Sequence, residues 1–231
     1  MTASNESVAL QGLKQLLQTS SPAELGPRMR PGTLPVGPLN EQVNALIRKS
    51  TLPERGQNLI RGTLLLWHDH LDEAHSIAQI VEDSDGNLLH AIMHRREPDY
   101  GNSKYWFRRA GKHPCYSRIA SQVQTLVNAC DANLGAQPAH EPTHPYPSQE
   151  GNGQSSPPGR GRGGFRVALC APSPGWFLQD GVWNPSAFVD ACETAERRQV
   201  AGVERMILQE IQKIESASFL EHLCGHRTLH S

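Results

Sequence analysis

Histidines and carboxylates gather in the sequence WHDHLDEAH, a pattern able to bind a metal ion. On a continuous helix with about 100° per residue, His68, Asp72 and His75 lie in one sector, at the edge of an apolar stripe. A second pair, His90 and His94, is spaced i, i+4, which places two imidazoles on one helix face. Nitrogen and oxygen ligands of this kind suit zinc, iron or manganese. If the two segments pack antiparallel, these five side chains could converge on one divalent transition metal ion.

The same histidines also have a purely structural interpretation. A histidine among apolar residues is commonly a hydrogen-bonded part of a core, and the spacing HxxxH occurs often by chance. Burying several imidazoles without partners costs free energy, however, so a cluster of them needs some compensating group. Both interpretations remain open for each histidine.

The element expected to position the first ligands is a long helix from Gln57 to Val81. On this helix Asp69 and Glu73 point away from the predicted ligands, which indicates a solvent-exposed face. The residues DSDGN, at 83–87, predict a tight turn, and the segment that carries the second histidine pair follows it.

A cationic segment comes next and is the candidate binding region for a small anionic ligand. Its candidate residues are Arg95, Arg96, Tyr105, Arg108 and Arg109. The planar fork of a guanidinium group suits a carboxylate or a phosphate. The alternative is that Arg95 and Arg96 pair internally with Glu97 and Asp99, while the neighbouring aromatic side chains pack.

The stretch HAIMHRREPDYGNSKYWFRRAGKHP, together with WHDHLDEAH, resembles a family of small bacterial and fungal proteins. These share a core of the form HxIMHRREPDxxNxxYWFRRxGxHP, and the resemblance covers residues 64–114, with an echo at 183–193. It implies a dedicated site and no particular reaction. The His68-Asp69 dipeptide is also weakly similar to that of HD-type metal phosphohydrolases, helical enzymes with further His and Asp ligands, although the downstream spacing here departs from their pattern.

Composition limits the classes of protein that remain. The chain has 231 residues, 37% of them hydrophobic, with 20 glycines and 17 prolines, so we expect one compact domain with tails. A net charge of −1 argues against a general nucleic-acid or membrane-surface protein. Five cysteines without a CxxC pair indicate a reducing compartment. No apolar stretch approaches the roughly 20 residues of a membrane span, so the expected location is the cytoplasm.

Helical periodicity without convincing period-two runs predicts an all-α fold, a single-domain bundle of about five helices. We expect four parts: an N-terminal helix and arm at 1–37, a helical core with the site at 38–133, a disordered Pro/Gly-rich insertion at 134–166, and C-terminal helices at 167–231. The insertion has too few apolar residues to offset the entropy lost on ordering.

Two hypotheses about function follow from these patterns. The first is a metal-dependent enzyme, a hydrolase by default, in which Glu97 or Glu193 acts as the base for metal-bound water. Its substrate would be a small anion. The second is a non-catalytic helical binding module or accessory protein, which would use Tyr105, Trp106 and Arg108 to bind a partner while the histidines stabilise the core.

Overall fold

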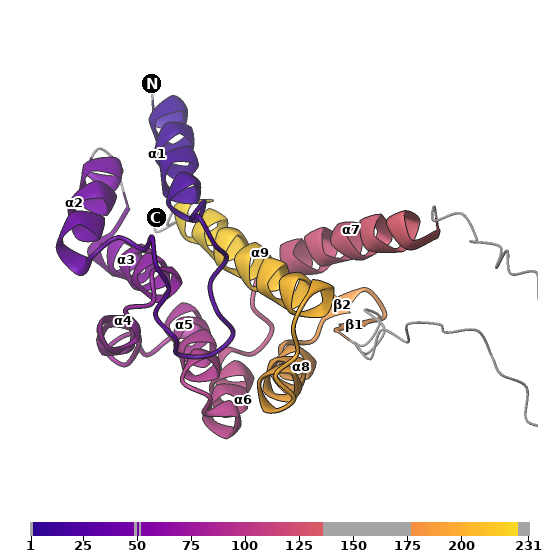
Figure 1. Ribbon diagram of the computed structural model, residues 1–231. Coiled ribbons are helices and arrows are strands. Elements are labelled where there is room, and N and C mark those ends of the chain that lie inside the picture. The colour runs from indigo at the N-terminus through magenta and orange to yellow at the C-terminus, as the bar shows by residue number, and fades with distance from the viewer. Residues whose placement is uncertain (1, 49, 51, 136–176, 226–231) are drawn as a thin grey trace, which may run out of the picture.

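Figure 1 shows the computed structural model, which describes residues 2–48, 50, 52–135 and 177–225. Within these ranges the chain forms nine helices and one short hairpin, and the all-α fold is thereby confirmed. The elements are α1 (Thr2–Leu16), α2 (Val36–Ile47), α3 (Glu54–Trp67), α4 (Leu71–Ala78), α5 (Ser84–Arg96), α6 (Tyr100–Ala110), α7 (Tyr116–Gly135), β1 (Leu178–Gln179), β2 (Val182–Trp183), α8 (Pro185–Arg197) and α9 (Val203–Gly225). The predicted disordered insertion lies outside the described residues, apart from its first two. None of the described helices is both long and apolar enough to cross a membrane.

Helix α9 passes through the middle of the arrangement and packs against α1, α3, α7 and α8 (Figure 1). Its buried side chains Leu208, Ile211, Phe219, Leu220 and Leu223 follow the helical period. Helices α5 and α6 pack closely on each other, and α4 lies against both α3 and α5. These contacts bring the two histidine-bearing segments together.

The predicted long helix from Gln57 to Val81 is wrong, because the chain leaves the helix after Trp67 and resumes it at Leu71. Asp69 lies in the break with a φ of 69°, the left-handed region that side chains other than glycine seldom adopt. Such a backbone costs about 1–3 kcal/mol and persists only where other contacts hold it. Here the contacts are ion pairs from the Asp69 carboxylate to Arg30 and Arg96.

The predicted turn at 83–87 is in fact the start of α5. The Asp83 carboxylate accepts hydrogen bonds from the backbone N–H groups of Asp85 and Gly86, both at 3.0 Å, which makes it the N-cap of this helix. Asn184 caps α8 in a similar way, with Pro185 as the first helical residue and a 3.1 Å hydrogen bond from Ala187 N–H to Asn184 Oδ1.

The segment before α8 was not expected to form a sheet, but residues 178–183 make a two-stranded antiparallel hairpin. Asp180 and Gly181 both have positive φ at its turn, which gives the backbone twist that short hairpins favour. Phe177 and Trp183 pack against Phe188, so the hairpin is attached to α8 through aromatic contacts.

Gly86→Ala is expected to destabilise the protein by about 1–3 kcal/mol or more, because an added Cβ would lie 1.9 Å from the Val81 carbonyl oxygen and the backbone must shift. Thermal unfolding measures the effect. Gly101→Ala in α6 is the matched control, since nothing lies within 4 Å of its Cβ position. Equal melting temperatures for the two variants would contradict the close approach at Gly86.

Candidate metal centre

Three of the five predicted ligands meet in the structure. His75 projects from α4, and His90 and His94 project from α5, with ligand atoms that all lie within 4.8 Å of one another. The Nε2 atoms of His75 and His90 are 3.1 Å apart. The rings of His90 and His94 are stacked, with centroids 4.7 Å apart, as the i, i+4 spacing predicts. We call these three residues the histidine cluster.

Glu97 adds a carboxylate to the histidine cluster, just beyond the end of α5. Its Oε2 lies 3.2 Å from His94 Nδ1, and its Oε1 lies 3.7 Å from His75 Nδ1. The side chain is partly exposed, so it can exchange protons with solvent. Of the two acids predicted as bases, only Glu97 lies at the histidine cluster. Glu193 is on α8 and pairs with Arg197 at 2.6 Å.

Helix α6 also contacts the histidine cluster, through Trp106 and Asn102. The Trp106 ring stacks on His90, with centroids 4.1 Å apart, and Asn102 Nδ2 lies 3.1 Å from His94 Nε2. Arg109 lies over the outer side of Trp106, 5.4 Å from the ring centroid. These contacts restrict the rotation of the imidazoles, as the outer contacts of metal-binding histidines do.

Burial lowers the pKa of two members of the histidine cluster, His90 and His94, and so favours their neutral imidazoles. Burial lowers the pKa of His90 to about 4, and positive charge on His94 or His75 lowers it further. Burial also lowers the pKa of His94, against the opposing effect of the Glu97 carboxylate. Neutral imidazoles have a free lone pair, which is the form that binds metal ions.

The stability of the metal-free protein is expected to fall as the pH drops from about 6.5 to about 4. In that window the unfolded chain protonates His90 while the folded protein does not, so protons favour unfolding; the effect ends below the folded pKa of about 4. Melting temperatures measured across this range should decline less steeply for His90→Gln. An unchanged slope in this variant would show that His90 titrates normally.

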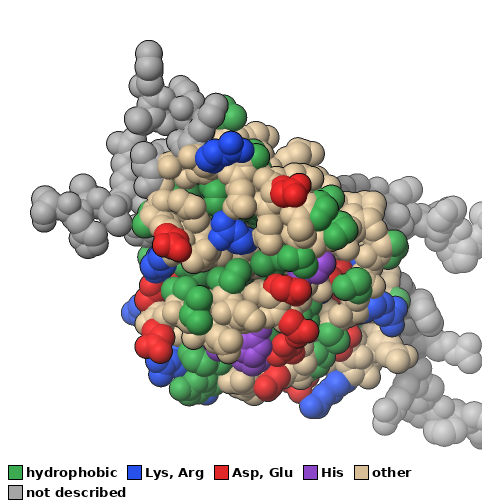
Figure 2. All heavy atoms as spheres, turned by 90° about the vertical axis from the view of Figure 1, so that its left-hand side faces the viewer, with side chains coloured by type: hydrophobic (Ala, Val, Ile, Leu, Met, Phe, Trp, Pro, Cys, Tyr) green, Lys and Arg blue, Asp and Glu red, His purple; other side chains and the backbone are tan. Residues whose placement is uncertain are grey.

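A cleft of about 740 Å³ lies beside Glu97, between α4 and the chain that precedes α6. It is lined by Pro27, Met29, Asp69, His70, Leu71, Asp72, Glu73, Glu97 and Asp99. On the face of the molecule that carries α2, α3 and α4, acidic side chains gather around histidine (Figure 2). The approach from this side therefore has a negative potential.

His68 and Asp72 do not join the histidine cluster. His68 accepts a hydrogen bond from Leu34 N–H at Nδ1, and its Nε2 lies 3.1 Å from the Leu16 carbonyl oxygen, so both ring nitrogens are engaged by the backbone. Asp72 is exposed and lines the cleft. The break between α3 and α4 explains the difference, because it turns α4 away from the direction that a continuous helix would give it.

Arg95 and Arg96 are fully buried in ion pairs and do not face an open pocket. Arg95 binds both carboxylate oxygens of Glu215, and its guanidinium lies 4.5 Å from the centroid of the Phe188 ring. Arg96 donates to Asp69 Oδ1 at 2.8 Å and to two backbone carbonyls. Arg95 and Arg96 are therefore paired internally, as the alternative interpretation of these arginines proposed. Their partners are Glu215 and Asp69, and not the predicted Glu97 and Asp99.

The prediction that Asp69 lies on a solvent-exposed face is wrong. Its carboxylate is fully buried between Arg30 and Arg96. The remaining candidates for anion binding, Tyr105, Arg108 and Arg109, are exposed on α6. Arg109 Nη1 donates to the Tyr105 hydroxyl at 3.4 Å.

A second cluster of ligand-type side chains was not predicted from the sequence. Asp85, His113 and His222 have ligand atoms within 4.8 Å of one another. They come from distant parts of the chain, so no local spacing could have indicated them. The only sequence signal is that His113 belongs to the GKHP stretch, which ends the family-like core.

Three comparisons, with models of protein families, with curated proteins and with solved structures, find no match for this chain.

Proposed function

We propose that the protein is a metal-dependent enzyme in which His75, His90 and His94 bind one divalent transition metal ion. The observation that carries this proposal is the convergence of three imidazoles, whose ligand atoms lie within 4.8 Å of one another. Three protein ligands with a fourth position open to water are typical of catalytic zinc sites, whereas structural sites use four protein ligands. Iron and manganese accept the same donor set.

Hydrolysis is the default reaction for such a site. A bound metal ion lowers the pKa of its water toward about 7 and so supplies a nucleophile near neutral pH. Glu97 is the proposed base, because its carboxylate contacts two members of the histidine cluster and also borders the cleft. Asn102 and Trp106 would hold His94 and His90 in their orientations.

The charges around the site restrict the substrate. The carboxylates of the cleft disfavour an anion on that side, and Arg95 and Arg96 are already paired. An anionic group would have to approach along α6, where Arg108, Arg109 and Tyr105 are exposed. We therefore propose a small anionic substrate that approaches along α6. A cytoplasmic location is also proposed, since Cys115, Cys130 and Cys192 are free thiols.

The test is a titration of the metal-free protein with Zn²⁺ and Co²⁺, followed by calorimetry. His75→Gln and His94→Gln should each weaken binding by at least the roughly 10–100-fold that loss of an outer contact costs. His70→Gln is the matched control, because His70 borders the cleft but lies outside the histidine cluster. Its affinity should equal that of the wild type.

Equal affinities in all these proteins, or no stoichiometric metal and no thermal stabilisation by one, would favour the second function, a non-catalytic binding module. The observation behind this alternative is the exposed surface of α6, where Tyr105 is 44% exposed and its ring lies beside Arg109. Exposed aromatic and arginine side chains are common in binding surfaces.

A further inference from the structure

Asp85 joins two histidines that come from other parts of the fold. Asp85 lies in the first turn of α5, His113 lies in the connection between α6 and α7, and His222 lies in the last turn of α9. The Oδ1 atom of Asp85 is 2.8 Å from the Nε2 atom of each histidine. The side chain of His113 is fully buried, and those of His222 and Asp85 are mostly buried.

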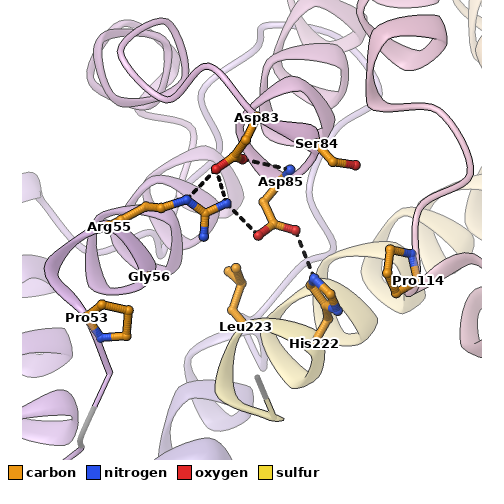
Figure 3. Close-up of a pocket in the computed structure, with 9 residues that line it drawn as sticks. All are labelled: Pro53, Arg55, Gly56, Asp83, Ser84, Asp85, Pro114, His222 and Leu223. Atoms are coloured by element: carbon orange, nitrogen blue, oxygen red, sulfur yellow. Dashed lines mark hydrogen bonds and ion pairs between the residues drawn. The ribbon is translucent and has the colours of Figure 1, made fainter. Parts of the chain in front are cut away.

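The second carboxylate oxygen of Asp85 has a different partner. Its Oδ2 accepts a hydrogen bond from Arg55 Nη2 at 2.7 Å, and Arg55 also pairs with Asp83 (Figure 3). Asp85 therefore presents Oδ1 alone to the two imidazoles. Arg55 holds the carboxylate in that orientation, as the outer partners of metal-binding carboxylates do.

His113 is also held at its other ring nitrogen. Its Nδ1 lies 3.0 Å from Cys115 Sγ. Burial raises the pKa of Cys115 far above its usual range, so the group remains a thiol. Nδ1 also accepts a hydrogen bond from the Cys115 backbone N–H at 3.3 Å, which places the ring proton on Nε2, where it is donated to Asp85. For Nε2 to bind a metal ion, this proton would have to move to Nδ1, where the thiol sulfur could accept its hydrogen bond in place of the contact with the backbone N–H.

The charge balance at this cluster favours a cation. Asp83 and Asp85 contribute two negative charges, and Arg55 contributes one positive charge. Arg55 donates to Asp85 Oδ2 at 2.7 Å and also pairs with Asp83, so one guanidinium group faces two carboxylates. Apart from the two imidazoles, the charged groups of the cluster therefore sum to a net negative charge.

A cavity of about 310 Å³ opens next to Asp85 and His222, between Arg55 and Pro114 (Figure 3). Asp85 and His222 point toward its interior, so an ion can reach them from solvent. The cavity also has room for water as a further ligand, because one water molecule needs only about 30 Å³.

We propose that Asp85, His113 and His222 form a second divalent metal site, distinct from the histidine cluster. The ion would take the Nε2 lone pairs and Oδ1, in place of the two N–H···O hydrogen bonds. Two imidazoles and one carboxylate are the ligands of several zinc sites. Since the three ligands come from α5, the α6–α7 connection and α9, binding would fasten the start of α5 to the end of α9.

His222→Gln separates a metal site from a simple hydrogen-bonded contact. The glutamine amide can still donate to Asp85, but it is a poor ligand for transition metals. In the full chain carrying His75→Gln and His94→Gln, Zn²⁺ calorimetry should still find one bound equivalent and a raised melting temperature. Adding His222→Gln should weaken that remaining binding by at least about 10–100-fold.

The two proposals fail separately in this experiment. If the wild type binds Zn²⁺ but the protein carrying His75→Gln and His94→Gln binds none, the second site is overturned and the histidine cluster stands. If the wild type binds one equivalent that only His222→Gln removes, the second site stands and the proposed function fails. If His222→Gln does not fold, Asp85→Asn serves as the second variant. A Zn²⁺ affinity that Asp85→Asn leaves unchanged would also overturn the second site.

Discussion

Asp69→Ala is expected to lower the free energy of unfolding by about 3–5 kcal/mol, the cost of removing one partner from a buried ion pair. The Asp69 carboxylate accepts hydrogen bonds from Arg30 Nε at 3.0 Å and from Arg96 Nη2 at 2.8 Å, and it is fully buried. Its loss leaves two buried guanidinium groups without a counter-charge. It also removes the contact that holds the backbone between α3 and α4. Since domains are stable by only about 5–15 kcal/mol, the variant should be partly unfolded at physiological temperature.

Urea unfolding of Asp69→Ala and Glu73→Ala checks this expectation. Glu73 is an acid only four residues away, but it is exposed on α4, so its replacement should change stability by no more than about 0.5 kcal/mol. On the continuous helix expected from the sequence, both acids would face solvent and both variants would be nearly neutral. Similar small changes in stability for both variants would therefore support the continuous helix and contradict the buried position of Asp69.

Glu215→Ala is expected to have a comparable effect, again about 3–5 kcal/mol, because it leaves Arg95 charged and unpaired inside the protein. Both side chains are fully buried, and both Nη atoms of Arg95 donate to the Glu215 carboxylate. Helix α5 carries the arginine and α9 carries the glutamate, so the pair connects the site-bearing helix to the central helix of the fold.

The double variant Arg95→Met with Glu215→Leu tests whether the unpaired charge of Arg95 causes this loss of stability. Replacing both members of a buried ion pair by apolar side chains of similar volume is often neutral or stabilising, so the stability should return toward that of the wild type. Zn²⁺ affinity at the histidine cluster should also be retained, because Arg95 does not face it. A double variant as unstable as Glu215→Ala, measured by urea unfolding, would show that packing around Phe188 needs the guanidinium itself.

Local features of the sequence predicted the all-α fold, although the described residues form nine helices where a bundle of about five was expected. The i, i+4 spacing of His90 and His94 placed both imidazoles on one face of α5, and Glu97 followed within one turn. Each of these inferences depends on residues close together in the chain, where helix geometry alone sets the distances.

The break after Trp67 could not be predicted in that way, because its cause is not local. Asp69 adopts a strained conformation only because Arg30 and Arg96, 39 and 27 residues away, bind its carboxylate. Once the helix ends there, His75 turns toward α5, whereas His68 is hydrogen-bonded to the backbone of the N-terminal part of the chain. The sequence thus contained the ligands of the histidine cluster but could not separate them from Asp72 and His68.

The cluster of Asp85, His113 and His222 depends entirely on tertiary structure. Its residues are separated by 28 and 109 positions along the chain, and nothing in their spacing relates them. They meet only because α9 buries its apolar face in the core and so brings its last turn to the start of α5. Sequence determines the type of each side chain and its local helix, but packing decides which side chains become neighbours, since burial of apolar surface drives the distant contacts.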